Sequence, residues 1–353
     1  MTGTERAEPS DVREPDAAGV ALAEPAADDE AVTPAEPGEM PPTHWRRHPN
    51  GRWIVGDPGN QPAVVATPAV LVRRRPDLAV DGCRVGSLDY RAASLRGLSH
   101  LETGKPRQDS YAVAVTRDGH WLVGCVADGV SAGKLSHRAA DLACEKIVSE
   151  LIDGLAEAGI EADLGKLRWD AAVDSANDAI KNEFLRTLRS SRNQQQEIEA
   201  DEVTLADVRQ HMSSTAVAFV VATHPGPDGT HRSLVTAIAG DSSALLLRDG
   251  AWSPVTAVKG AGDEVASSEV RPLPRVVTPE PNAIQLRPGD VLAVISDGIG
   301  DPMGSGGGVV GRFLAEQWTS PPDTIEFAHQ VGFYRRTFVD DRTAVAVWTA
   351  AEP

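Results

Sequence analysis

The sequence predicts an α+β fold in which helices are layered on antiparallel sheet. Apolar runs of strand length are joined by tight turns, and an Asp-Gly turn at 118–119 separates the expected strands 111–115 and 121–127. Turns of this kind connect antiparallel neighbours. Two consecutive amphipathic helices follow, at about 135–152 and 169–188, instead of the strand–helix alternation that builds a parallel sheet. We therefore expect a layered α+β domain.

The chain divides into three parts by composition. Residues 1–43 carry eleven acidic side chains against Arg6 and Arg13 and contain no aromatic residue. Such a segment cannot bury enough apolar surface to offset its ordering entropy, so we expect a disordered, acidic, Ala- and Pro-rich tail. A solvated tail is the simpler interpretation, and docking or phosphorylation is the alternative. Residues 44–84 are expected to be a short N-terminal extension, and residues 85–350 the main domain.

The elements of these two folded parts follow from local pattern. The extension contains Trp45, Trp53 and a Pro-broken apolar run, which indicate short strands. Its arginines at 73–75 could grip an anion, although such a run is more often a solvated face. The segments at 190–211 and 256–285 are interpreted as a mobile excursion and a surface flap. Further apolar runs predict strands near 87–95, 215–222, 234–239, 244–247, 291–295 and 343–348, and helices at 313–318 and 324–334.

Charge and cysteine usage narrow the function classes. The chain has a formal net charge of −17, whereas nucleic-acid binding needs clustered Lys and Arg. Cys83, Cys125 and Cys144 are odd in number and have no CxxC spacing, which is typical of a reducing compartment. The N-terminus lacks the apolar core of a signal peptide, and no run approaches the roughly 20 apolar residues that span a bilayer. The sequence predicts a soluble cytoplasmic protein with no nucleic-acid or membrane partner.

Aspartates recur at the ends of the apolar strands. One Asp-Gly turn alone carries little information, because Asp is a favoured turn residue. Here the expected strands 111–115 and 121–127 pair antiparallel, which places the residues before the first and after the second at one sheet edge. Carboxylates crowded at one edge repel one another unless a divalent cation neutralises them. The five aspartates at such strand ends are Asp109, Asp128, Asp241, Asp297 and Asp340.

These ligand types favour a particular metal and chemistry. Oxygen ligands without a His or Cys set favour Mg²⁺ or Mn²⁺, and backbone carbonyls near Gly129 could add further oxygens. Two such ions about 4 Å apart lower the pKa of a shared water and orient it for in-line attack. The chain has no GxSxG elbow, Walker A or HExxH pattern. We therefore interpret the aspartates as a metal site that hydrolyses phosphate esters on protein, with unrelated strand-ending turns as the alternative.

At this point the residues resemble the metal-dependent Ser/Thr protein phosphatases of type 2C, bacterial members included. The resemblance covers about residues 95–349 and implies a four-layer sandwich, in which two antiparallel β-sheets are flanked by α-helices and the metals lie at one edge. Its pieces are specific together, not singly. In the family's order they are GLSHLETGKPRQDSYAV, VADGVSAG, SSTAVAFVV, AIAGDSSALLLRDG, LRPGDVLAVISDGIGD and FVDDRTAVAVW.

The resemblance also implies a role for each carboxylate. Asp128 would bridge two Mg²⁺ or Mn²⁺ ions, and the carbonyl of Gly129 would bind one of them. Asp297 and Asp340 would complete one ion, and Asp109 would hold the other, partly through water. The four aspartates named here are the candidate catalytic residues.

A third ion and a reaction follow from the same resemblance. Asp241 with Asp297 would form the weaker third-metal site seen in bacterial relatives. The implied reaction is hydrolysis of phosphoserine or phosphothreonine by a metal-bridging hydroxide, without a phosphoenzyme. Phosphorylated proteins are the implied partners, with a Ser/Thr kinase or its substrates as the natural choice.

The chain departs from the family pattern on the phosphate side. Gly104 stands where many members carry an Arg that binds phosphate, and His100, Lys105 and Arg107 are the candidates to replace it. Two other positions also differ: Val130 replaces a His that could protonate the leaving group, and Asp341 replaces an Asn, as in the sporulation and stress-response branch. The alternative function is therefore a catalytically weak or inactive phosphoprotein-binding regulatory module of the same fold. A scaffold built around the acidic tail is a third possibility.

Overall fold

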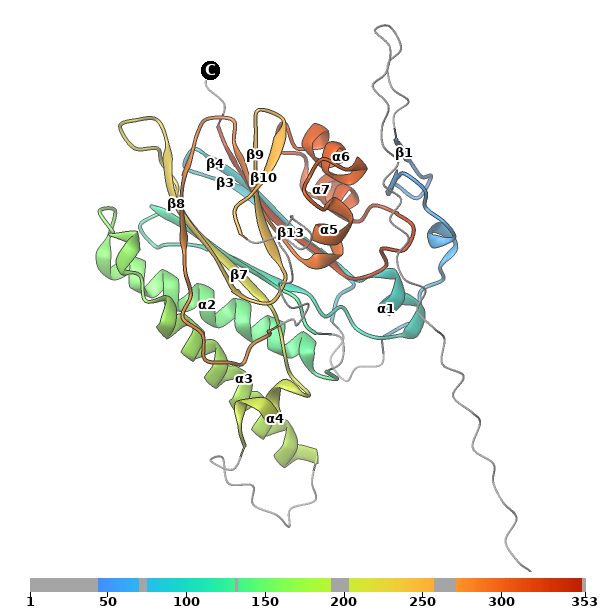
Figure 1. Cartoon of the computed structure of the whole chain (residues 1–353), viewed down its shortest axis with the longest axis horizontal. Coiled ribbons are helices and arrows are strands. Elements are labelled where there is room, and N and C mark those ends of the chain that lie inside the picture. The colour runs from blue at the N-terminus through green and yellow to red at the C-terminus, as the bar shows by residue number, and fades with distance from the viewer. Residues whose placement is uncertain (1–43, 70–74, 131–132, 192–202, 257–270, 351–353) are drawn as a thin grey trace, which may run out of the picture. The chain divides into compact units, whose positions relative to one another are not determined.

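The computed structural model describes most of the chain after the acidic segment. The expectation of a disordered tail lies outside the described residues, as do those for Arg73 and Arg74. In the described parts of the chain, no helix is both long and apolar enough to cross a membrane. The described residues are 44–69, 75–130, 133–191, 203–256 and 271–350 (Figure 1).

Two antiparallel sheets form the centre of the folded unit. The first has the strand order β10-β9-β12-β13-β4-β3 and the second the order β11-β8-β7-β6-β5. The strands of the first sheet are β3 (Leu78–Val85), β4 (Leu88–Leu95), β9 (Ser243–Arg248), β10 (Ala251–Pro254), β12 (Val291–Ile295) and β13 (Arg342–Thr349). Those of the second are β5 (Ser110–Val115), β6 (Trp121–Ala127), β7 (Ala216–Ala222), β8 (His231–Ala239) and β11 (Asn282–Leu286).

The central strands are buried on both faces, which explains their continuous apolar runs. Side chains alternate between the faces of a strand. In β6, Leu122 and Val126 point into the core between the sheets, whereas Val123 and Cys125 belong to the core beneath the helices. In β12, the side chain of Leu292 likewise packs between the sheets. This arrangement fixes the register, because a slip by one residue would exchange the two faces.

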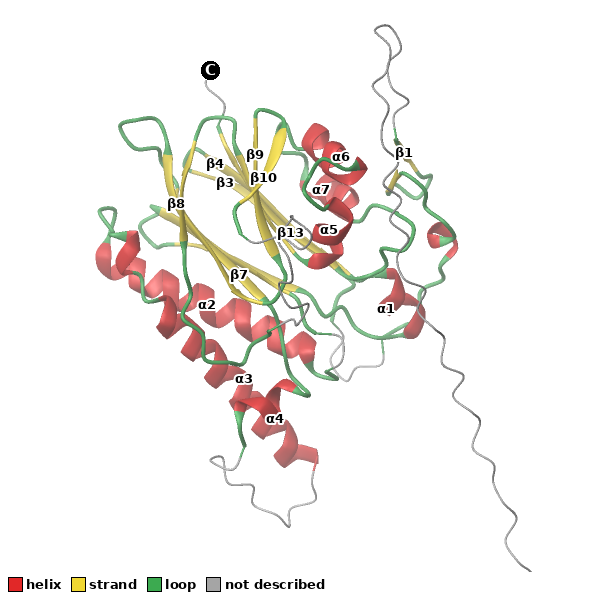
Figure 2. Ribbon diagram, in the orientation of Figure 1, coloured by secondary structure: helices red, strands yellow, loops and turns green. Residues whose placement is uncertain are grey.

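Helices cover the outer face of each sheet (Figure 2). The long pair α2 (Ser136–Ala158) and α3 (Trp169–Ser191) packs on the second sheet. The shorter helices α5 (Asp297–Met303), α6 (Val309–Gln317) and α7 (Thr324–Val331) pack on the first. The order helix–sheet–sheet–helix confirms the four-layer α+β sandwich expected from the sequence.

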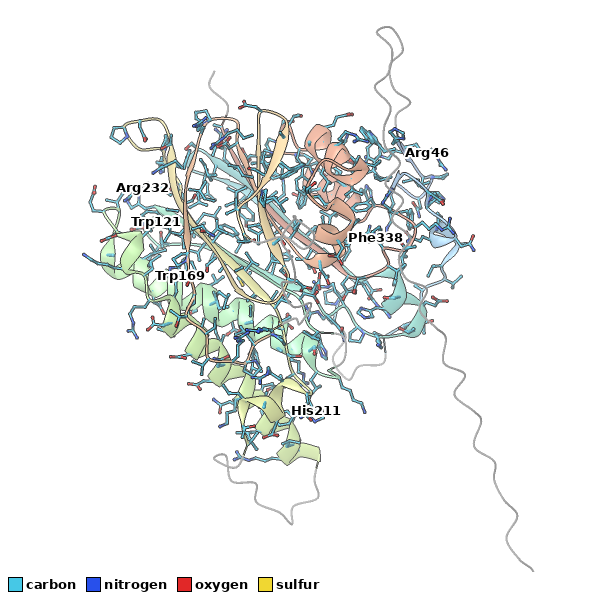
Figure 3. All side chains as sticks on the ribbon, viewed as in Figure 1. Arg46, Trp121, Trp169, His211, Arg232 and Phe338 are labelled. Atoms are coloured by element: carbon cyan, nitrogen blue, oxygen red, sulfur yellow. The ribbon has the colours of Figure 1, made fainter. Side chains whose placement is uncertain are left out.

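Trp121 anchors the first end of β6, opposite the end that leads to Asp128. Trp121 begins the strand, and its indole Nε1 donates to the carbonyl of Gly159 at 3.1 Å. The guanidinium of Arg232 lies 5.1 Å from the centre of the Trp121 ring (Figure 3). These contacts tie β6, β8 and the end of α2 together, so the opposite end of β6 leaves the sheet from a fixed position.

Several sequence predictions need correction. The last residues of the expected surface flap at 256–285 belong to a strand, because β11 pairs with β8 at the edge of the second sheet. Leu273, in the same segment, is fully buried and pairs with Ser214. Short helices were missed as well: α1 (Leu98–Thr103) in the loop before Asp109 and α4 (Leu205–Arg209) in the expected excursion. Both are too short for a 3.6-residue period to be visible.

The N-terminal extension packs against the helices that cover the first sheet. Its strands β1 (Trp45–Arg47) and β2 (Trp53–Val55) form a hairpin, which confirms the expected short strands. Trp45 and Trp53 lie 5.7 and 5.4 Å from the Phe313 ring, between centroids. A short turn, η1 (Gln61–Ala63), follows. Since β3 already starts at Leu78, the first sheet includes the end of the segment 44–84.

Candidate metal centre

The strand registers bring four aspartates to corresponding sheet edges. In the second sheet, Ser110 pairs with Ala127, so Asp109 before β5 and Asp128 after β6 leave that sheet at the same edge, as expected. In the first sheet, Ile295 of β12 pairs with Ala344 of β13. Asp297 and Asp340 therefore lie at the corresponding edge of the first sheet.

The two edges meet: the carboxylate of Asp341, the residue after Asp340, accepts the backbone N–H of Gln108, the residue before Asp109. The carboxylates of both sheets also affect one another's pKa values. Burial raises the pKa of Asp128 well above its usual value, and the charges of Asp109 and Asp297 raise it further. Burial also raises the pKa of Asp297 to about 6; Asp128 opposes this rise through a hydrogen bond, while the charges of Asp340 and Asp241 add to it. The structure thus brings together all five aspartates singled out from the sequence.

Asp109 provides the test of whether this cluster suits a cation. Its side chain is 1% exposed, and its Oδ2 atom is buried without a hydrogen-bond partner among the described residues. Burial and the nearby charge of Asp341 raise its pKa to about 7. Burying an unpaired carboxylate oxygen is costly, whereas a hard divalent cation would satisfy it and neutralise its neighbours. The donor set, all oxygen, fits Mg²⁺ or Mn²⁺.

The aspartates of the cluster differ in their exposure to solvent. Asp128, Asp241 and Asp297 are half-buried, and Asp340 is exposed by surface area. The pKa of Asp340 is nevertheless raised, first by burial of its carboxylate and then by the charge of Asp341. Asp340 remains in contact with solvent. Asp340 thus marks the open side of the cluster.

Hydrogen bonds with Thr215 fix both backbone groups of Asp128. The N–H of Asp128 donates to Thr215 Oγ1 at 2.9 Å, and its carbonyl accepts from the N–H of Thr215 at 2.8 Å. Thr215 Oγ1 is also 2.7 Å from the hydroxyl of Ser242, the residue after Asp241. Gly129 is buried and forms a bridge with Ser214. The start of β7 therefore links the positions of Asp128 and Asp241.

Two arginines donate hydrogen bonds to the backbone carbonyl of Asp109. Arg107 Nη1 donates to the carbonyl of Asp109 at 3.0 Å and to the hydroxyl of Ser94. Arg75 donates to the same carbonyl and, at 2.9 Å, to Asp141 Oδ2 of α2. The expectation of a solvated face is therefore wrong for Arg75. The bonds of Arg107 to protein groups favour a supporting role over contact with phosphate.

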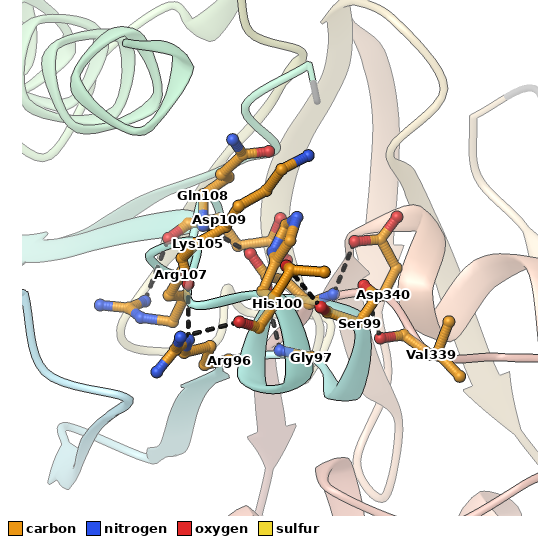
Figure 4. Close-up of polar contacts among 12 residues, drawn as sticks. Arg96, Gly97, Ser99, His100, Lys105, Arg107, Gln108, Asp109, Val339 and Asp340 are labelled. Carbon is orange, nitrogen blue, oxygen red and sulfur yellow. Dashed lines mark hydrogen bonds and ion pairs between the residues drawn. The ribbon is translucent and has the colours of Figure 1, made fainter. Parts of the chain in front are cut away.

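The remaining phosphate candidates lie on and after α1 (Figure 4). His100 is 4% exposed, and its Nδ1 lies 2.9 Å from Asp341 Oδ1. Burial lowers the pKa of His100, but the hydrogen bond and charge of Asp341 outweigh it, so the net pKa is raised. Lys105 is exposed, and its charge acts on His100. Gly104 ends α1 with φ of 75°, a left-handed conformation that disfavours the family's Arg.

Asp341 is the functional neighbour that sequence reasoning undervalued. It is 1% exposed, and its ligand atoms lie within 4.8 Å of those of His100 and Asp340. The sequence showed it only as a departure from a family pattern. The sequence feature that could have predicted its role is the Asp340-Asp341 pair before a buried strand, because two adjacent carboxylates there need different partners.

Comparison with solved structures finds bacterial phosphatases of low sequence identity. The serine/threonine phosphatase PstP/Ppp of Mycobacterium tuberculosis is 22% identical, with 75% of this chain and 99% of that chain covered at a TM-score of 0.46. A serine/threonine phosphatase of S. agalactiae is 18% identical, with 78% and 100% covered at a TM-score of 0.42. The SpoIIE phosphatase-domain structure from Bacillus subtilis is 14% identical, with 78% and 70% covered at a TM-score of 0.46. No curated protein matches the chain.

The family itself is shown by a sequence model. The model of protein phosphatase 2C matches residues 96–333, which is more than half of the chain. The matched range contains Asp109, Asp128, Asp241 and Asp297, and it ends shortly before Asp340. The chain therefore belongs to the protein phosphatase 2C family.

Proposed function

We propose that this chain is a divalent-metal-dependent phosphatase that hydrolyses phosphoserine and phosphothreonine in proteins. The observation that carries the proposal is a cluster of buried carboxylates at the meeting edges of the two sheets, in which burial and neighbouring negative charges raise the pKa values of Asp109, Asp128 and Asp297. Such a cluster is unfavourable without a cation and therefore indicates a function that uses one. Family membership makes phosphate-ester hydrolysis the chemistry of choice.

The proposed roles follow the positions of the carboxylates. Asp128 and the Gly129 carbonyl would hold two Mg²⁺ or Mn²⁺ ions, with Asp109 on one and Asp297 and Asp340 on the other. When bound, the ions would supply a water of lowered pKa and positive charge for the phosphoryl oxygens. Asp241 with Asp297 would hold a weaker third ion.

The chain's own residues have the remaining tasks. All four candidate catalytic carboxylates must lose their protons, which the metal charge favours. Arg75 and Arg107 fix the Asp109 carbonyl, so that its carboxylate keeps its direction. Lys105 is the exposed cation beside the cluster and is our candidate for attracting the phosphate group, with His100 next to it.

The proposed substrates are phosphorylated proteins, among them a Ser/Thr kinase or the proteins it modifies. The exposed position of Asp340 suits a substrate that approaches from solvent. Cys83, Cys125 and Cys144 are all free thiols, which supports a reducing compartment such as the cytoplasm.

A second candidate function is a regulatory module that binds phosphoproteins with little or no turnover. One specific observation favours it: Gly104 ends α1 where the family's phosphate-binding Arg would stand, and Arg107 is engaged with protein groups. Binding of phosphopeptide without turnover, at saturating Mn²⁺, would support this function.

The decisive experiment titrates Mn²⁺ into the full chain and follows hydrolysis of p-nitrophenyl phosphate and of Ser-, Thr- and Tyr-phosphorylated peptides. We expect Asp128→Asn to lower activity by roughly three orders of magnitude, because it removes a ligand shared by both ions. Asp118→Asn is the matched control, since Asp118 is an exposed turn residue at the far end of β5. Equal activity of wild type and Asp128→Asn would refute the proposal.

A further inference from the structure

The buried carboxylate of Asp341 joins two segments that are far apart in the sequence. Its Oδ2 accepts the backbone N–H of Gln108 at 2.5 Å. Its Oδ1 accepts the backbone N–H of Gly97 at 2.5 Å and lies 2.9 Å from His100 Nδ1. We call this set of contacts the Asp341 brace. It connects the start of β13 to the turn before α1, to α1 itself and to the segment before β5.

Both ends of the brace are adjacent to candidate metal ligands. Gln108 immediately precedes Asp109, and Asp341 immediately follows Asp340. The backbones also pack directly: a Cβ atom on Gly97 would lie 2.2 Å from the carbonyl carbon of Asp340. A change at Asp341 would therefore reach Asp340 directly along the backbone and Asp109 through the single residue Gln108.

The contacts argue against a separate cation on His100, Asp340 and Asp341, although these three could in principle ligate one. Both oxygens of Asp341 already accept N–H groups, and two of these donors are backbone amides that cannot become acceptors. A cation at Asp341 would have to displace them and leave buried amides unpaired, which is costly. The arrangement is suited to holding polypeptide, not an ion.

We propose that Asp341 is a positioning residue that sets the separation of Asp109 and Asp340 and thereby the affinity of the centre for Mg²⁺ or Mn²⁺. This inference rests on the proposed function for its metal, but it assigns a role to a residue outside the ligand set. His100 is part of the device, because its Nδ1–H fills the remaining acceptor position and ties α1 to the same carboxylate. Residues that orient metal ligands commonly change metal affinity by about 10- to 100-fold when they are altered.

The sharpest test is the isosteric change Asp341→Asn in the full chain. An amide has one acceptor oxygen and an NH₂ donor, so it cannot accept N–H groups on both sides. Either the bond to Gln108 or the bonds to Gly97 and His100 must be lost. We expect Mn²⁺ binding, measured by calorimetry, to weaken by about 10- to 100-fold.

Asp290→Asn is the matched control for a general loss of stability. Asp290 is also buried, and it accepts the backbone N–H of Arg287 at 2.6 Å and Arg248 Nη2 at 2.6 Å. It stands before β12, whereas Asp297 stands after it, so it lies away from the cluster. We expect a lower melting temperature for Asp290→Asn with unchanged Mn²⁺ affinity. Equal weakening of Mn²⁺ binding in both variants would overturn the proposal.

A pair of variants at His100 keeps the test informative if Asp341→Asn does not fold. The Nδ2–H of Asn can replace the Nδ1–H of His, whereas Ala offers no donor. We expect His100→Ala to weaken Mn²⁺ binding and His100→Asn to restore most of it. Wild-type affinity in His100→Ala would refute the brace.

The same calorimetry separates this inference from the proposed function. A wild-type chain that hydrolyses phosphopeptides, and whose Mn²⁺ affinity Asp341→Asn leaves unchanged, would refute the brace alone. A wild-type chain that binds Mn²⁺ without turnover, and loses affinity in Asp341→Asn, would refute the enzyme and support the brace. Absence of Mn²⁺ binding in the wild type would refute both.

Discussion

The two sides of the candidate centre are built differently. On the metal side, carboxylates from both sheets converge. Hydrogen bonds with Thr215 fix the backbone of Asp128, and donors from Arg75 and Arg107 fix the carbonyl of Asp109. On the phosphate side, the family's Arg position is occupied by Gly104 at the end of α1, and the nearby cation, Lys105, is exposed. The metal side is therefore preorganised by the sheets, whereas the phosphate side depends on a short helix and its end.

The largest expected effect is on the stability of the chain when no metal ion is bound. Burial raises the pKa of Asp109 from 3.8 to about 7, so between these values the folded state binds a proton that the unfolded state does not. Stability of the metal-free chain should consequently fall as the pH rises from about 4 to about 7. Three pKa units correspond to an upper limit of about 4 kcal/mol.

Urea unfolding in EDTA at pH 5 and pH 7.5 checks this prediction. The wild type should be less stable at the higher pH, and Mn²⁺ should remove the difference. Asp109→Asn should reduce the pH dependence in EDTA, with the raised pKa values of Asp128 and Asp297 accounting for the remainder, and should weaken the stabilisation by Mn²⁺. An EDTA profile with the same slope in wild type and Asp109→Asn would contradict the view that Asp109 is the strained group.

A second prediction concerns the close approach of the start of α5, which carries Asp297, to the segment before β13, which carries Asp340. A Cβ atom on Gly298 would lie 1.9 Å from the carbonyl oxygen of Asp341, so Gly298→Ala must move β13 away from α5. We expect a loss of about 1–3 kcal/mol in stability and a larger proportional loss of activity, because Asp297 and Asp340 would separate.

Gly307→Ala is the control for this substitution. Gly307 is exposed, and a Cβ atom there would meet nothing within 4 Å. Chemical denaturation and Mn²⁺-dependent turnover measured on both variants test the prediction. Retention of full turnover in Gly298→Ala would show that the spacing of Asp297 and Asp340 tolerates movement.

The difference between the two sides also explains what the sequence could predict. Asp109 and Asp128 could be placed at one sheet edge because an Asp-Gly turn fixes the antiparallel pairing of β5 and β6. The contact between that edge and Asp297 was inferred from the recurrence of aspartates at strand ends and from family resemblance, since no local pattern encodes how two sheets stack. The partners of Asp341 could not be predicted, because Gln108 lies 233 residues away and donates a backbone N–H, which leaves no trace in side-chain pattern.

The phosphate side shows the same limit in another form. Arg107 has the expected chemistry for binding phosphate, but its guanidinium lies 3.0 Å from the Asp109 carbonyl oxygen and is buried. Burial and the neighbouring Arg75 lower its pKa to about 10, which still leaves it charged at neutral pH. Sequence position alone cannot distinguish an Arg that faces solvent from one that supports a backbone carbonyl.

The smallest expected effect is at Lys105, which tests whether the phosphate side contributes to substrate binding at all. If Lys105 attracts the phosphate group, Lys105→Ala should raise KM for phosphopeptide by about 3- to 10-fold and leave Mn²⁺ affinity unchanged, since an exposed charge pair contributes about 1 kcal/mol. Lys166→Ala removes an equivalent charge from an exposed residue in the η2 turn (Leu164–Lys166) and should leave KM unchanged. A KM of Lys105→Ala equal to that of the wild type, with kcat retained, would mean that the metal side alone binds the phosphate group. The difference between the two sides would then be complete, with every contact to the substrate phosphate made through the ions.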